Sequence, residues 1–384
     1  RRPDFPVRRR EAAGPILTIH GMADARIASD GVDRCCALEM TAPSPRETIM
    51  SRFLSRPTPL KRLLSVALLA VGALSGAAAL AEDAYPQRPI TLVVPHPPGG
   101  SVDGVARLYA EQLGKELGQS VVVENRAGAS GMIGAAYVAR AAPDGYTLYL
   151  NASIHAINPL LYKKTIKFDS VKDFTPISEL AQGALIFSVN PKVPANNVQE
   201  LVKVLKADPQ KYSFATTGFG SAGHLAAASF LHDNGLDQIP IVLYRGGGPA
   251  LSDMVGGQVQ GLIDPMLSSL PMVRAGKLRA VALTGAERSP LLANVPTMKE
   301  QGQKNFEFYS WYGVWGPANL PQPILRKLES VSAKVMASPK VAEQLNGLGF
   351  EPSVKDSAAF AKFIDAEMKR YQVIIDQAKI QITE

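Results

Sequence analysis

Four glycine-rich turns are the places where residue types and spacing in this sequence could do chemistry. They occupy residues 97–100, 125–131, 216–223 and 244–248, and each lies between a short apolar run and a helical pattern. A helix N-terminus presents unpaired backbone N–H groups and a partial positive charge, and glycine lets an anion approach that backbone closely. One exposed helix terminus contributes only about 0.3–1 kcal/mol, and excluding water strengthens every electrostatic contact. The pattern predicts an anion site made from several backbone dipoles and few formal charges.

The turns need elements that bring them together. Apolar and β-branched runs predict strands at residues 90–94, 121–124, 147–150, 213–215, 241–243, 261–263, 278–283 and 306–315. Helical periodicity covers residues 102–117, 133–140, 224–231, 249–256, 323–337, 339–348 and 357–378. Strands that alternate with helices predict an α/β fold with a mostly parallel sheet, which binds ligands beyond the carboxyl ends of its strands. Ser101 is the predicted N-cap of the first helix, and Pro339 fits position N1 of a late one.

A secretion signal precedes this domain. Lys61 and Arg62, the apolar run 63–76 and the ending Ala79-Leu80-Ala81 follow the order of a signal peptide. The run is shorter than the about 20 apolar residues of a membrane-spanning helix. We therefore expect residues 50–81 to be a signal peptide cleaved after Ala81, which places the protein in the periplasm. Residues 1–49 are expected to be upstream sequence translated from a wrong start.

Charge and cysteine content argue against several functions. Twelve of the 41 Lys+Arg residues and 7 of the 34 Asp+Glu residues lie in residues 1–81, which leaves 29 basic and 27 acidic residues in the mature chain. A near-neutral domain without clustered cations gives no case for nucleic-acid binding. Cys35 and Cys36 are the only cysteines, so the mature chain is expected to have no disulfide and no thiol nucleophile. Residues 82–384 have about the length at which one hydrophobic core stops growing and a chain divides into separate domains, which favours two lobes.

Two motif matches suggest an enzyme instead. Gly218, Gly220 and Gly223 satisfy the G-x-G-x-x-G fingerprint after a predicted strand, which leaves a dinucleotide-dependent enzyme as an alternative. An NAD site would need an acidic residue about 20 positions on, and that zone ends in Tyr244-Arg245. Ser221 near His224 could suggest a hydrolase, but Phe219 stands where a nucleophile elbow needs glycine, so capping is the favoured role of Ser221.

Metal binding has little support. His96, His155, His224 and His232 are widely spaced and form no paired motif, so no metal or other cofactor is expected.

Three charged residues beside the turns each have two interpretations. Asp103 either complements the helix dipole or bonds a ligand amine or a bridging water. Asp264, which precedes Pro265, either faces the cleft or forms a turn. Arg245 either pairs with a ligand carboxylate or points to solvent while Tyr244 contacts the ligand.

The order of these motifs resembles the Bug family, the solute receptors of tripartite tricarboxylate transporters. The similar segments are residues 85–95, 97–107, 121–129, 143–148, 244–251, 276–280, 295–297 and 310–313. Together the resemblance spans residues 85–380. His96 stands where the family would have an aromatic residue, and Ala127 stands where proline is commoner.

The resemblance implies a two-lobe type II periplasmic-binding-protein fold of the Venus-flytrap kind, in which each lobe is a mixed sheet flanked by helices. Lobe one is expected at 85–187 plus 307–384, and lobe two at 188–306. The implied function is capture of a small carboxylate by lobe closure and delivery to the membrane permease subunits of a tripartite tricarboxylate transporter. The ligand could be a dicarboxylate, a tricarboxylate, an acidic amino acid or an aromatic acid. The protein is expected to be a monomer without catalytic activity, and a ligand sensor for a signalling partner is an alternative.

The resemblance also implies that the turns at 98–101 and 127–131 hold one ligand carboxylate through backbone amides and ordered water. With the other turns, the expected ligand-binding residues are Pro98, Gly99, Gly100, Ser101, Asp103, Ala129, Ser130, Gly131, Ser153, His155, Gly218, Gly220, Ser221, Tyr244, Arg245, Gly246 and Asp264.

The leader interpretation predicts that the mature protein begins at Glu82, because the small residues Ala79 and Ala81 flank the expected cleavage site. Intact-mass measurement of protein recovered from the periplasm should give the mass of residues 82–384. A product that retains sequence from before residue 50 would contradict both the leader and the wrong-start interpretations.

Overall fold

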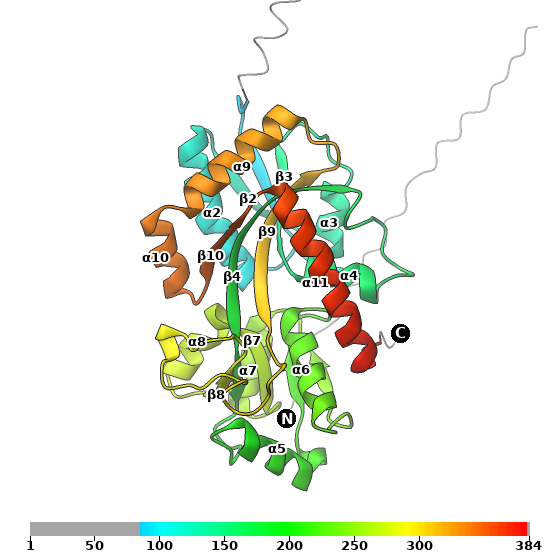
Figure 1. Cartoon of the computed structure of the whole chain (residues 1–384), viewed down its shortest axis with the longest axis vertical. Coiled ribbons are helices and arrows are strands. Elements are labelled where there is room, and N and C mark those ends of the chain that lie inside the picture. Colours follow the sequence, from blue (N-terminus) through cyan, green and yellow to red (C-terminus); the bar gives the residue numbers. More distant parts are fainter. Residues whose placement is uncertain (1–84, 382–384) are drawn as a thin grey trace, which may run out of the picture. The chain divides into compact units, whose positions relative to one another are not determined.

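The computed structural model describes residues 85–381 (Figure 1). The expected signal peptide and its cleavage site lie outside these residues. Within them, ten strands form one mixed sheet in the order β2-β1-β3-β9-β4-β7-β5-β6, and β10 and β8 also pair with β4. Helices pack on this sheet, so the predicted α/β alternation is confirmed. The expectation of a mostly parallel sheet is wrong, because every pairing of the long strand β4 and the pairing of β3 with β9 are antiparallel.

The first part of the sheet, here the first sheet region, contains strands from both ends of the domain. They are β1 (Ile90–Val94), β2 (Val121–Asn125), β3 (Thr147–Ala152), β9 (Tyr309–Pro317), β10 (Glu351–Lys355) and the beginning of β4 (Phe174–Val189). Its helices are α2 (Ser101–Leu117), α3 (Met132–Val138), α4 (Ile154–Leu161), α9 (Gln322–Met336), α10 (Pro339–Gly347) and α11 (Ser357–Gln377). β1 pairs in parallel with β2 and β3, whereas β9 is antiparallel to β3 and β4.

The second sheet region is formed by the middle of the chain. Its strands are β5 (Phe214–Thr216), β6 (Ile241–Leu243), β7 (Gly261–Pro265), β8 (Arg279–Leu283) and the end of β4. Its helices are α5 (Val198–Ala207), α6 (Ala222–Asp233), α7 (Gly247–Gly256) and α8 (Met266–Arg274). β5 pairs in parallel with β6 and β7, and β7 and β8 pair antiparallel with β4.

β4 joins the two sheet regions. Its residues up to Ala184 pair with β9 and β10, and its residues from Leu185 pair with β7 and β8. At about 3.3 Å per residue, these 16 residues span roughly 50 Å, and Figure 1 shows β4 running through both regions. Sequence analysis missed this strand because it is buried on both faces, contains Pro176 and Gly183, and shows no alternation of apolar and polar residues. It also missed α5, α8, β10 and most of α4.

Helix starts were predicted with mixed success. The N-cap of α2 is Gly100 and carries no side-chain cap, so the prediction of Ser101 as the cap is wrong by one residue. At α6, Ser221 is the N-cap, as its favoured role required, and its Oγ accepts the His224 backbone N–H at 3.1 Å. Pro339 starts α10 as predicted.

Candidate ligand-binding cavity

A cavity of about 410 Å³ lies between the two sheet regions, and its walls follow the carboxyl ends of five parallel-paired strands. The lining segments are 96–102 after β1, 152–154 at β3, 217–218 and 221–223 after β5, 245–249 after β6, and 264–265 with 267–268 at β7. Ser310 of β9 and Leu251 complete the wall. The volume is that of a small-molecule site.

Five helices begin at this cavity. The first turns of α2, α4, α6, α7 and α8 all contribute lining residues, including Ser101, Ile154, Ala222, Gly247 and Leu267. The first four N–H groups of a helix have no partner within it, and the helix dipole adds partial positive charge there. Three of these helices belong to the second sheet region and two to the first. The cavity therefore presents backbone donors to an anion from both sides.

Formal charges at the cavity are few. Arg245 lies on an exposed turn, and Asp264 is buried. Burial lowers the pKa of His96, and its Nε2 lies 3.0 Å from Asn151 Oδ1, an acceptor. His96 is therefore a neutral hydrogen-bond donor to Asn151 at neutral pH. Apart from Arg245 and Asp264, the charge that faces the cavity is the partial charge of the helix ends.

A hydrogen-bonded brace holds the turn between β1 and α2 in shape. The Asp103 carboxylate accepts the Gly99 N–H at 2.9 Å, two guanidinium N–H groups of Arg107 at 2.9 and 3.0 Å, and Asn125 Nδ2 at 2.8 Å. Asn125 Nδ2 also donates to the His96 carbonyl. Burial opposes ionisation of Asp103, but these donors outweigh it and lower its pKa. The ionised carboxylate fixes Gly99 at φ +84°, a conformation that favours glycine.

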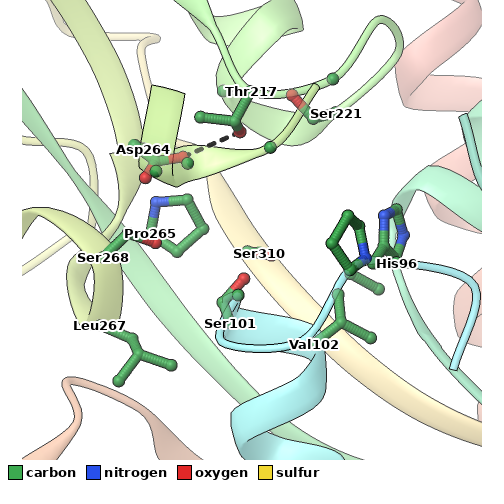
Figure 2. A pocket seen from close by; sticks show the side chains of 18 of the residues that line it. His96, Ser101, Val102, Thr217, Ser221, Asp264, Pro265, Leu267, Ser268 and Ser310 are labelled. Atoms are coloured by element: carbon green, nitrogen blue, oxygen red, sulfur yellow. Dashed lines mark hydrogen bonds between the residues drawn. The ribbon is translucent and has the colours of Figure 1, made fainter. Parts of the chain in front are cut away.

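Asp264 stands at the opposite wall, beside the starts of α7 and α8. Thr217 Oγ1 donates to its Oδ1 at 3.0 Å, and Figure 2 shows this contact beside Ser268. Its Oδ2 has no partner among residues 85–381. Burial raises the pKa of Asp264 to about 7, and the Thr217 hydrogen bond and the nearby Ser268 hydroxyl partly offset this rise.

The chain matches a family of receptors. A family model for the tripartite tricarboxylate transporter family receptor matches residues 105–380. The chain belongs to this receptor family. The protein BugT of Bordetella pertussis is 35% identical over 315 residues, covering 82% of this chain and 96% of BugT.

Solved receptors have the same fold. An R. palustris protein solved with adipate superposes with a TM-score of 0.74 at 35% identity, covering 77% of this chain and 99% of that one. MatC from Rhodopseudomonas palustris with bound malate gives a TM-score of 0.70 at 30% identity, covering 76% and 100%. These matches confirm the predicted periplasmic-binding-protein fold and the resemblance on which it rested.

The receptor's cavity brings together residues from all the turns except the second. Of the predicted binding residues, those that line it are Pro98, Gly99, Gly100, Ser101, Ser153, Gly218, Ser221, Arg245, Gly246 and Asp264. They come from segments that are up to 166 positions apart in the sequence, between Pro98 and Asp264.

The second turn lies outside the cavity lining, with Ala129 exposed and Ser130 half-buried. Ser130 Oγ hydrogen-bonds the Tyr162 hydroxyl at 2.9 Å, and Asn158 Nδ2 donates to the Ser130 carbonyl. With Ala129 and Gly131, Ser130 forms a short 3-10 turn in which all three residues have positive φ. A Cβ on Gly131 would meet Pro95 and Asn151, not the cavity.

Four other predicted residues do not line the cavity. Asp103 belongs to the brace, and Gly220 donates its N–H to His224 Nδ1 at 3.2 Å. The Tyr244 hydroxyl donates to Asp253 at 2.8 Å. His155 is buried among the rings of Tyr149, Phe168, Phe174 and Trp315.

Sequence analysis missed the start of α8 and part of α7. Pro265, Leu267 and Ser268 line the cavity, but no helix was predicted after β7. The signal was present, because Asp-Pro followed by a Ser-Ser pair after a strand is typical of a helix start. Gly247 and Gly248 also line the cavity; they lay inside a predicted turn but were not among the predicted ligand-binding residues.

Two further findings apply to residues 85–381 alone. No helix there is long and apolar enough to cross a membrane. No group of three or more His, Cys, Asp or Glu side chains there is placed to hold a metal ion.

The buried His155 predicts a loss of stability in acid. Burial lowers the pKa of His155 to about 3 in the folded protein, whereas its value in the unfolded chain is 6.5. Between these two pH values, the unfolded chain binds a proton at His155 and the folded chain does not. The free energy of unfolding should therefore fall by about 1.4 kcal/mol per pH unit for this group as the pH drops from 6.5 towards 3. Urea titrations at pH 7, 6, 5 and 4 should show a shallower fall for His155→Phe than for wild type. Parallel curves for the two proteins would contradict the assignment.

Proposed function

We propose that this receptor captures a small carboxylate in the cavity between its two sheet regions and carries it to the membrane subunits of a tripartite tricarboxylate transporter. The observation that supports this most is the convergence of five helix N-termini on one cavity with few formal charges. Such a cavity favours an anion, and the carboxylates bound by two similar receptors indicate the kind of anion.

The binding step is proposed to be coupled to closure. Here lobe one is taken as 85–187 plus 307–384 and lobe two as 188–306, so the chain crosses between lobes near residues 187 and 307. The first crossing lies in β4 just after its pairing changes, and the second lies just before β9. A carboxylate that touches α2 and α4 in one lobe gains the donors of α6, α7 and α8 only when the lobes close. The ligand therefore favours the closed state by its differential affinity.

Cellular placement completes the proposal. Because the solved receptors that this chain resembles include a periplasmic transporter, we place the mature protein in the periplasm, as a monomer without catalytic activity. The dinucleotide alternative has little support, because the segment 218–223 forms part of the shared cavity wall and Ser221 is engaged as an N-cap. A ligand sensor would close in the same way and would differ only in the partner, which would be a signalling protein that binds the closed form.

A glycine substitution tests the cavity. A Cβ on Gly100 would meet only the Pro97 carbonyl at 3.8 Å, and the backbone φ of −82° suits any residue. Gly100→Val should therefore fold normally but keep a carboxylate away from the first N–H groups of α2. We expect at least a tenfold loss of affinity, about 1.4 kcal/mol, by calorimetry with whichever dicarboxylate of a panel from malate to adipate stabilises the wild type.

Gly347→Val is the matched control, since Gly347 also has open space around it and lies outside the cavity at the end of α10. Unchanged affinity of Gly100→Val, with a wild-type melting curve, would exclude the turn from the binding site.

Closure predicts a change in size. Small-angle scattering of the mature protein should give a smaller radius of gyration when the same dicarboxylate is saturating, and the melting temperature should rise with its concentration. Superimposable scattering curves with and without ligand, at a concentration that raises the melting temperature, would leave a rigid binding module.

A further inference from the structure

Asp264 is the one carboxyl group on the cavity wall with an oxygen left unpartnered. Its exposure is 1%, Thr217 Oγ1 bonds its Oδ1, and its Oδ2 has no hydrogen-bond partner among residues 85–381. An unpartnered buried acceptor is costly, and more so when it is charged. A group of this kind at a binding cavity points to a donor that arrives with the ligand.

The free oxygen lies beside the start of α7. A Cβ built on Gly247 would lie 3.9 Å from Asp264 Oδ2 and 3.6 Å from Ser268 Cβ, so the three residues enclose one corner of the cavity. This corner also holds the unpaired N–H groups of α7 and α8. A ligand carboxylate on those N–H groups would lie next to Asp264, and the two groups repel each other whenever Asp264 is ionised.

No cation of the protein relieves this repulsion. Among the ion pairs of the described residues, none includes Asp264, and the lining cation Arg245 lies on an exposed turn. His96 lies on the other wall and bonds Asn151. Tyr312 is buried, and its hydroxyl oxygen accepts the Ser310 hydroxyl at 3.1 Å.

We propose that Asp264 selects carboxylates that carry a hydrogen-bond donor, either a hydroxyl or an ammonium group, on the carbon next to a carboxylate. The ligand carboxylate takes the N–H groups at the starts of α7 and α8, and the adjacent O–H or N–H donates to Asp264 Oδ2. The inference rests on the proposed function and narrows it from carboxylates in general to 2-hydroxy and 2-amino acids. Asp264 is then a specificity-determining residue.

Matched acids test the proposal. Calorimetry at pH 7.5 compares succinate with malate and aspartate, glutarate with 2-hydroxyglutarate and glutamate, and adipate with 2-hydroxyadipate and 2-aminoadipate, each chiral acid as both enantiomers. Within at least one chain length, an acid with a donor should bind about tenfold or more tightly than the unsubstituted acid. Whether the hydroxy or the amino acid shows the preference identifies the donor.

Variants assign the preference to Asp264. Asp264→Asn removes the charge but keeps the shape, so a preference for an amino acid should disappear. If the preference is for a hydroxy acid, Asp264→Ala is the decisive variant, because the oxygen of asparagine can still accept a hydrogen bond from the ligand hydroxyl. The matched control is Asp237→Asn, which makes the same change at an exposed residue outside the cavity and should keep the wild-type preference.

Melting curves verify that the variants fold. Because burial raises the pKa of Asp264 above its unfolded value, its ionisation lowers stability as the pH rises through the range from about 4 to 7. Asp264→Asn should therefore melt at a higher temperature than wild type at pH 8, with a smaller difference at pH 5.

The outcomes separate this inference from the proposed function. If the unsubstituted acids bind as tightly as their substituted partners, or if the preference survives in Asp264→Ala, the inference is wrong and the carboxylate receptor stands. If no acid of any series binds the wild type, the proposed function fails and this inference fails with it.

Discussion

The structure depends on one constraint, which is that the ends of helices leave backbone N–H groups unpaired. In this receptor five helices begin where parallel-paired strands end, and both sheet regions turn those ends toward the same cavity. Such donors can hold an anion without a buried cation. The same donors serve any carboxylate, which suits a fold shared by similar receptors solved with adipate and with malate.

Backbone donors are useful only if the turns that present them keep their shape. The brace formed by Asp103, Arg107 and Asn125 does this for the first turn, since it fixes a backbone N–H and a backbone carbonyl of residues 96–99. At α6, the Ser221 cap and the His224 ring hold the equivalent segment. Charged and polar side chains therefore act here mainly behind the cavity wall, where they position the backbone that faces the ligand.

Against this uniform background a single side chain can decide specificity. Asp264 is a buried carboxyl group in a cavity that otherwise attracts anions, so when ionised it discriminates by what it repels as well as by what it accepts. Its position at the junction of β7 and α8 also makes it part of the moving lobe in the proposed closure. Recognition of a substituent and closure of the cavity would then occur in the same step.

The sequence by itself determined the local elements and most of the turns that make the cavity. Alternation of apolar runs with helical periodicity predicted the strands β1 to β3 and β5 to β9 and the helices α2, α6 and α7 at the cavity, because these signals lie within a few residues. It did not predict β4, whose burial on both faces is set by partners more than 70 residues away, or the helix after β7. Only the tertiary structure decided that Pro98 and Asp264 line one cavity while Ser130 bonds Tyr162 outside it and His155 is buried in the core. The reason is physical: a turn's chemistry follows from its own residues, but whether it faces ligand or core depends on which elements pack against it.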